Sequence, residues 1–161
     1  MSTLKMTTNT KLILLKQKFK DSSEVISTLG QLAKEQGLVD DTYLPAILER
    51  EIKYPTGLEL PISIAIPHID TGVKRSFVSI TTLEEPVDFN NMDGSDDKVK
   101  AQIVFVFGIM DPKDQLTILR KFAASFAYKE KIQPLLDAKD ESELIEILNV
   151  LLDQMLAIEE V

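Results

Sequence analysis

The chain has 161 residues, which predicts a single domain over 1–161 that buries a core without disulfide or metal cross-links. Its 18 basic and 26 acidic residues give a net charge of −8, which disfavours nucleic-acid binding because that function usually needs a basic surface. The chain has no cysteine, which excludes disulfides and thiolate catalysis, and a single histidine, His68, which excludes multi-histidine zinc sites.

Two patterns bear on the compartment. The longest apolar run, at 103–110, is far shorter than the roughly 20 residues that cross a bilayer. The apolar run at 12–15 is too short for the core of a signal peptide. We therefore expect a cytoplasmic protein without a membrane-spanning segment.

The N-terminal third is predicted to hold one strand and one helix. Residues 1–10 are rich in Thr and Ser, and we expect a loose segment there. The apolar run at 12–15 predicts a short strand. Asp21 with Glu24 three positions later resembles a capping box and predicts a helix start, after which apolar residues recur at helical spacing. Gly37 is a typical helix stop.

The middle of the chain is predicted to hold a second helix and three strands. The helix is expected from 40 or 41 to about 53, with Pro45 tolerated in its first turn. A polar loop is expected over 86–97, which contains the turn-forming pair Asp93-Gly94. The expected strands are 62–66, 77–83 and the very apolar 99–109, which is predicted to be central in its sheet.

The C-terminal third is predicted to be helical. Asp111-Pro112 is typical of a helix start, a short helix is expected around 132–136, and a last helix is expected from about 141 to 158. Strands interleaved with helices predict an α/β fold, specifically a three-layer α/β/α sandwich with a mixed central sheet.

His68 is the side chain best placed for chemistry. It follows Pro67 at the end of a predicted strand, a position where functional residues often lie. Proline restricts the local backbone, which predicts a stiffly mounted, solvent-facing imidazole. An imidazole with an ordinary pKa of about 6.5 is largely neutral near neutral pH. Neutral imidazole can attack phosphorus. From position alone, an ordinary loop residue is the commoner explanation of such a histidine.

Several segments, in order, resemble a known family: the IIA components of the bacterial phosphoenolpyruvate-dependent sugar phosphotransferase system, of the mannitol/fructose type. The resemblance runs from about Leu12 to Leu152. The Tyr-Pro-Thr-Gly sequence at 54–57 is most similar to the galactitol-specific branch. The segments that carry the resemblance are Glu49-Arg50-Glu51, Pro55-Thr56-Gly57, Ile64-Ala65-Ile66-Pro67-His68, Phe89, Gln115-Leu116 and Leu119.

The resemblance implies that His68 is phosphorylated on Nε2 and that Arg50 lies beside the phosphohistidine. A guanidinium group matches phosphoryl oxygens well, although a solvated cation at a helix end is the alternative for Arg50. Many members of the wider family have a second histidine where this chain has Gln115. A glutamine amide can still donate a hydrogen bond to phosphate, and an exposed helix residue is an equal alternative.

Thr56 and Asp70 are candidate supporting residues. The Thr56 hydroxyl is a candidate contact to phosphate, but a plain turn role is commoner. Asp70 is expected either to orient the imidazole of His68 or to cap a turn. We also expect an apolar rim around His68 that includes Ile66 and Ile69.

The resemblance further implies a cytoplasmic phosphocarrier with no metal and no organic cofactor. The donor would be the phosphorylated histidine-containing carrier protein. The acceptor would be a cysteine of a IIB component. A membrane IIC component would handle the sugar, galactitol or a related one. Two alternatives stay open: a regulatory phosphorylation module that controls a partner without moving sugar, and a plain binding domain in which His68 is inert.

Overall fold

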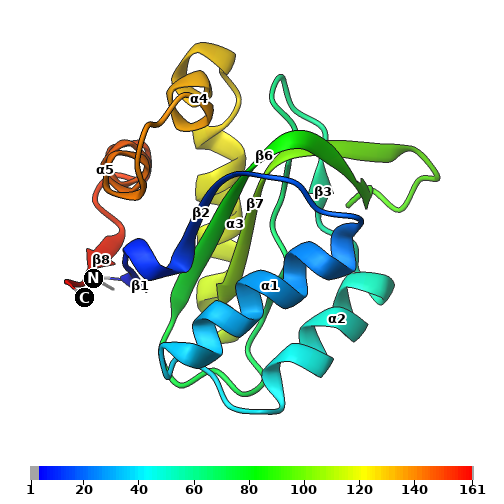
Figure 1. Ribbon diagram of the computed structural model, residues 1–161. Helices are drawn as coiled ribbons and strands as arrows, with labels where there is room; N and C mark the ends of the chain where they lie inside the picture. The colour runs from blue at the N-terminus through cyan, green and yellow to red at the C-terminus, as the bar shows by residue number, and fades with distance from the viewer. Residues whose placement is uncertain (1–3, 161) are drawn as a thin grey trace.

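Figure 1 shows a computed structural model of the chain, which describes residues 4–160. Five α-helices and eight strands form in this part of the chain. The helices are α1 (Ser22–Glu35), α2 (Tyr43–Lys53), α3 (Pro112–Ser125), α4 (Lys129–Leu136) and α5 (Glu141–Leu151). The strands are β1 (Met6–Thr8), β2 (Ile13–Gln17), β3 (Gly57–Leu58), β4 (Ile64–Ala65), β5 (His68–Ile69), β6 (Phe77–Asn90), β7 (Lys98–Gly108) and β8 (Leu156–Ile158).

The strands form one mixed sheet in the order β3-β4-β7-β6-β1-β8. The long strands β6 and β7 are antiparallel, whereas β4 and β5 both run parallel to β7. Strand β2 pairs with β6 in parallel. Strand β7 is therefore central, as its apolar sequence predicts.

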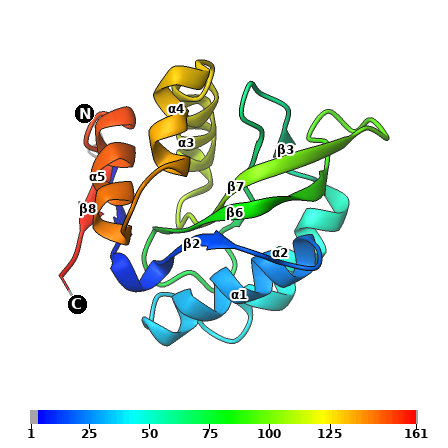
Figure 2. The ribbon, with the colours of Figure 1, turned by 45° about the horizontal axis from the view of Figure 1, so that its top comes forward.

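Helices cover both faces of the sheet (Figure 2). Helices α1 and α2 lie on one face, and α3, α4 and α5 lie on the other. The chain therefore has two cores, one on each side of β7. Because successive strand residues point to opposite faces, Val104 and Val106 join the core under α1 and α2, while Phe105 and Phe107 join the core under α3 to α5. The predicted α/β/α sandwich with a mixed sheet is confirmed.

The helix starts predicted at Asp21 and at Asp111-Pro112 are confirmed by their caps. The Asp21 carboxylate accepts a hydrogen bond from the Glu24 backbone N–H at 2.9 Å. Asp111 caps α3 in the same way, accepting from the Lys113 N–H at 3.0 Å. Gly37, with φ +72°, follows the end of α1 in the left-handed conformation that glycine adopts at low cost. Local side-chain chemistry therefore sets these boundaries. The helix predicted from 40 or 41 begins at Tyr43 without a side-chain cap, and the one predicted at 132–136 begins at Lys129.

The polar loop predicted over 86–97 is wrong in its first part. Strand β6 continues to Asn90, and only the turn between Asn90 and Lys98 lies outside the ladder. The register of β6 against β7 shifts between Thr82 and Val87. Pro86 lies within this irregularity, where a residue without an N–H does not break a regular ladder.

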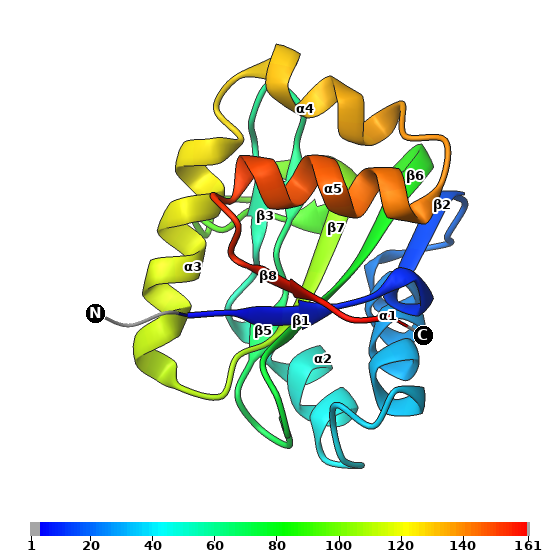
Figure 3. The same cartoon turned by 90° about the vertical axis from the view of Figure 1, so that its left-hand side faces the viewer.

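Strands β1 and β8, near the two ends of the described chain, lie side by side (Figure 3). The helix predicted over 141–158 ends at Leu151, because Asp153 and Gln154 adopt positive φ. Strand β8 then pairs in parallel with β1. Buried strand β1 lies in the segment predicted to be loose, so that prediction is wrong for Met6–Thr8, while residues 1–3 lie outside the described part.

None of the helices within residues 4–160 combines the length and apolar character that crossing a membrane requires.

Candidate functional site

The sheet itself holds His68. The strand predicted over 62–66 is shorter in the structure, where β4 spans only Ile64–Ala65. Pro67 lies between β4 and β5. The Pro67 carbonyl accepts a hydrogen bond from the Phe107 N–H, and His68 pairs with Phe107 of β7. The imidazole was predicted to face solvent, but His68 is only 5% exposed. Because the backbone of His68 is held in the sheet and the residue is largely buried, little of the imidazole ring is accessible to reagents.

The hydrogen bonds of His68 define its tautomer. Nδ1 lies 2.8 Å from the backbone carbonyl oxygen of Ile66. Because a carbonyl oxygen only accepts, Nδ1 carries the proton and Nε2 is unprotonated. Burial lowers the pKa of His68, and the charge of Arg50 acts in the same direction, while the hydrogen bond to Ile66 opposes them. The ring is therefore neutral at neutral pH, with Nε2 as its nucleophilic atom.

Arg50 meets that nucleophilic atom from the last turn of α2. Its Nη2 donates a 3.5 Å hydrogen bond to Nε2 of His68. Its Cζ lies 5.4 Å from the centre of the Tyr54 ring, which holds the guanidinium group by a cation–π contact. Arg50 Nε is buried and has no hydrogen-bond partner within residues 4–160. A buried donor without an acceptor is costly, so an incoming anion would improve this arrangement.

Glu51 belongs to the site, although no role for it is predicted from the sequence. Both of its carboxylate oxygens accept hydrogen bonds from Thr56: Oε2 from the backbone N–H at 2.9 Å and Oε1 from the hydroxyl at 2.7 Å. Burial raises the pKa of Glu51 to about 7, although the two bonds from Thr56 and the charge of Arg50 lower it. The available signal was a carboxyl group on the helix just before a turn that contains a threonine.

A cavity of about 440 Å³ lies beside His68. The structure brings together three of the predicted site residues in its lining, namely Arg50, Thr56 and His68. The cavity is lined by Arg50, Lys53, Tyr54, Pro55, Thr56, His68, Met92, Asp93, Gly94 and Leu119.

Three of the predicted site residues lie elsewhere. Among the described residues, Gln115 is not part of the cavity lining, although Leu119 one turn later is. Asp70 is exposed, and its backbone carbonyl accepts from the Val73 N–H in a turn, so the Ile66 carbonyl orients the imidazole instead. Ile66, expected at an apolar rim, is 1% exposed and belongs to the core.

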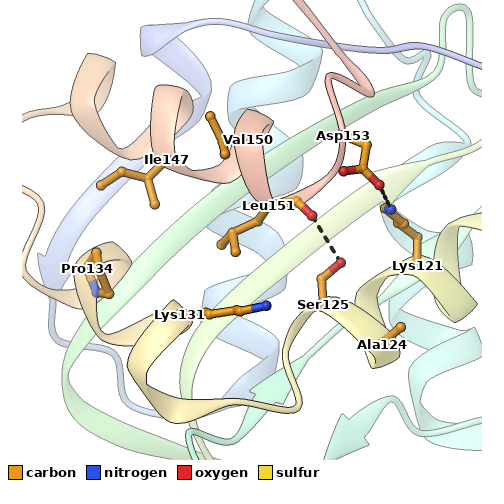
Figure 4. Close-up of a pocket in the computed structure, with 9 residues that line it drawn as sticks. All are labelled: Lys121, Ala124, Ser125, Lys131, Pro134, Ile147, Val150, Leu151 and Asp153. Carbon is orange, nitrogen blue, oxygen red and sulfur yellow. Dashed lines mark hydrogen bonds and ion pairs between the residues drawn. The ribbon is translucent and has the colours of Figure 1, made fainter.

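A larger cavity of about 730 Å³ lies between α3, α4 and α5 (Figure 4). Its lining includes Pro134, Ile147 and Val150. Two of its polar groups have partners: Lys121 forms an ion pair with Asp153, and the Ser125 hydroxyl donates to the Leu151 carbonyl. Lys131 also lines the cavity, and its Nζ lies 5.2 Å from the centre of the Tyr128 ring. The lining contains no imidazole, so this cavity lacks the pair of an imidazole and an arginine found at His68.

Comparison with known proteins places the chain in a family. Residues 6–150 match the family model described as phosphoenolpyruvate-dependent sugar phosphotransferase system, EIIA 2. The galactitol-specific EIIA component of Escherichia coli strain K12 is 34% identical over 104 residues, covering 63% of this chain and 69% of that protein. The mannitol-specific enzyme IIA component of Geobacillus stearothermophilus is 31% identical over 142 residues, covering 85% and 91%.

A solved structure supports the same fold. The complex of the mannitol enzyme IIA with phosphorylated enzyme IIB from Escherichia coli contains a chain that superposes with a TM-score of 0.69 at 23% identity, covering 87% of this chain and 95% of that one. The chain described above belongs to the EIIA type 2 family of the phosphoenolpyruvate-dependent sugar phosphotransferase system. Members of this family are phosphocarrier components of sugar phosphorylation.

Proposed function

We propose that this chain is a cytoplasmic phosphocarrier that accepts a phosphoryl group on Nε2 of His68 and passes it to a IIB component during uptake of galactitol or a related sugar. The donor in this proposal is the phosphorylated histidine-containing carrier protein. One observation carries it: the Ile66 carbonyl holds the proton on Nδ1, which leaves the Nε2 lone pair beside the guanidinium group of Arg50.

The chemistry is a pair of in-line displacements at phosphorus. In the first, the Nε2 lone pair forms a P–N bond while the P–N bond to the donor imidazole breaks, and its electrons return to that ring. In the second, an acceptor thiolate attacks phosphorus and the bond to Nε2 breaks. Phosphoryl transfer depends mostly on positioning and charge stabilisation. Arg50 supplies the charge, and its unpartnered Nε–H is a further donor for a phosphoryl oxygen.

The rim of the cavity suits transient protein partners. Tyr54 is 64% exposed and Met92 is 37% exposed, and both line the cavity of His68. Aromatic residues and methionine are enriched at protein interfaces. A complex of a similar IIA protein with phosphorylated IIB has been solved, which supports a IIB acceptor for this chain. The choice of galactitol rests on the galactitol-specific relative and on the Tyr-Pro-Thr-Gly segment.

A reconstituted phosphorelay tests the proposal. Purified chain is mixed with phosphoenolpyruvate, enzyme I and the histidine carrier, and the adduct is located by mass spectrometry at neutral pH. We expect one acid-labile phosphoryl group on His68 and none in His68→Ala. Purified galactitol and mannitol IIB proteins are then added separately, and we expect faster transfer to the galactitol protein. An adduct that no IIB accepts would favour the regulatory alternative, and no adduct with an active donor would refute the proposal.

A further inference from the structure

Glu51 carries a partly buried carboxyl group beside the site that the displacement steps above do not use. Thr56 is its partner at both oxygens, and the side chain of Thr56 is itself almost fully buried. Thr56 also lines the cavity that contains His68. Its backbone carbonyl accepts from the N–H of Ile66, the residue whose own carbonyl orients the imidazole. Thr56 therefore connects Glu51 to the phosphoryl site.

The protonation of Glu51 decides what Thr56 can offer to a ligand. A threonine hydroxyl has a single proton to donate. When Glu51 is ionised, Oε1 takes that proton, so the hydroxyl presents only lone pairs to phosphoryl oxygens, which are also acceptors. When Oε1 carries a proton, the carboxyl group donates to Oγ1 instead. The hydroxyl proton of Thr56 is then free to point at a phosphoryl oxygen.

We propose that Glu51 is a positioning residue that takes up a proton from solvent when His68 becomes phosphorylated, which switches the Thr56 hydroxyl from Glu51 to the phosphoryl group. The inference deepens the proposed function and rests on it. One proton passes from hydronium to Oε1, which forms the O–H bond of the carboxyl group and leaves water. No bond between heavy atoms changes, and one hydrogen bond reverses its direction.

The surroundings of Glu51 favour this uptake. Burial already raises its pKa to about 7, and a nearby phosphoryl dianion disfavours the carboxylate further. Arg50 is the cation that opposes the shift. Across a small cavity, Glu51 faces the hydroxyls of Ser22 and Ser23 from α1, together with Asp88 of β6 and Lys98 of β7. Asp88 is paired with Lys100, and Lys98 donates to Asn90, so both charges already have partners.

Glu51→Gln provides a close mimic of the protonated state. Its amide group can donate to Oγ1 of Thr56 while its carbonyl oxygen accepts from the Thr56 N–H. Phosphoryl exchange between the histidine carrier and this chain is followed by phosphorus NMR from pH 6 to 9. We compare the equilibrium constant for phosphoryl exchange in the wild type with that in Glu51→Gln. We expect this ratio to fall as the pH rises above the pKa of Glu51 in the unphosphorylated protein. The fall is at most about tenfold per pH unit, which is the limit for one coupled proton.

Thr56 variants test whether the relay passes through the hydroxyl. Thr56→Val, which keeps the shape but removes the donor, is expected to lower the exchange constant about tenfold at pH 6.5, where one hydrogen bond to a charged group is lost. Thr56→Ser is expected to restore it. In the Thr56→Val background, Glu51→Gln should have no further effect on the pH profile.

A spectroscopic measurement separates proton uptake from a merely structural role. With ¹³C-labelled glutamate, the Glu51 carboxyl signal is assigned from its loss in Glu51→Gln and titrated before and after phosphorylation. We expect its midpoint to move to higher pH in the phosphorylated protein. An unchanged midpoint, or a wild-type pH profile in Glu51→Gln, would overturn the inference while leaving the phosphocarrier function intact. Failure of the wild type to form any adduct would overturn both.

Discussion

Two cavities of the molecule differ in size and in the chemical groups that line them. The one between α3, α4 and α5 is larger, at about 730 Å³ against about 440 Å³ beside His68. In the larger cavity, Lys121 pairs with Asp153, the Ser125 hydroxyl donates to the Leu151 carbonyl, and the lining contains no imidazole. Beside His68, the unprotonated Nε2 lies against Arg50, and the buried Arg50 Nε–H has no acceptor among residues 4–160. An unprotonated imidazole nitrogen beside an arginine, and not the volume of a cavity, therefore identifies the candidate site.

The largest expected effect comes from His68. In His68→Ala, phosphoryl acceptance should fall to background, because this is the chain's single histidine and its Nε2 is the proposed nucleophile. Acceptance is measured by transfer of radiolabelled phosphate from the histidine carrier. Circular dichroism and thermal unfolding serve as fold controls. Retained acceptance in a folded variant would move the site away from the smaller cavity.

Arg50 should have the next largest effect. Removing one preorganised charge-stabilising donor from such a site typically slows the reaction by about 10²–10³-fold. We expect a loss of that size in Arg50→Ala, and a smaller loss in Arg50→Lys, because a lysine keeps the charge but lacks the guanidinium fork. Rapid-quench measurement of a single phosphoryl transfer checks this. A wild-type rate in Arg50→Ala would assign the side chain to the solvated helix end.

The free energy of unfolding should report on the protonation of Glu51 without any phosphoryl transfer. The pKa of Glu51 rises from its ordinary 4.5 to about 7 in the folded protein. The folded state therefore binds more protons than the unfolded state between these pH values, so the free energy of unfolding falls as pH rises through that window. At pH 8 we expect Glu51→Gln to be more stable than wild type by about 1–3 kcal/mol, measured by urea unfolding.

At pH 4 the same comparison should show little difference, because Glu51 is then protonated in both states. Equal stability gains at pH 4 and pH 8 would attribute the effect to packing and contradict the raised pKa.

The smallest effect is expected in the larger cavity. Val150 lines it and is 68% exposed, so Val150→Ser should change the free energy of unfolding by no more than about 0.5 kcal/mol. Its phosphoryl-transfer rate should stay within about twofold of wild type, because the variant leaves every group around His68 unchanged. The rapid-quench assay used for Arg50 measures this. A large loss would show that the two cavities are coupled.

Features that depend on local chemistry could be predicted from the sequence. The residue types at Asp21 and Asp111 predict the starts of α1 and α3, where both side chains cap their helices. The apolar run in β7 predicts a central strand. Features that depend on distant pairing could not. Strand β8 exists because it pairs with β1 from the other end of the chain. No local sequence pattern predicts a parallel pairing between segments so far apart in the chain.

The same division holds within the site. The motif segments pointed to His68 and Arg50, and the structure places them in contact. The burial of the imidazole and the Ile66 carbonyl as its partner arise from the pairing of β5 with β7, which is a tertiary feature. The double hydrogen bond from Thr56 to Glu51 depends on how the chain turns after α2, so only the structure reveals it.

Nitrogen NMR of the imidazole tests the central claim most directly. Because the sequence has a single histidine, ¹⁵N-histidine labelling reports on His68 alone. Before phosphorylation, we predict a neutral ring at pH 7.5 with its proton on Nδ1. After incubation with the phosphorylated histidine carrier, we predict phosphorus coupling to Nε2 with the Nδ1 proton retained. A ring protonated on Nε2, coupling to Nδ1, or an unchanged spectrum with an active donor would contradict the account.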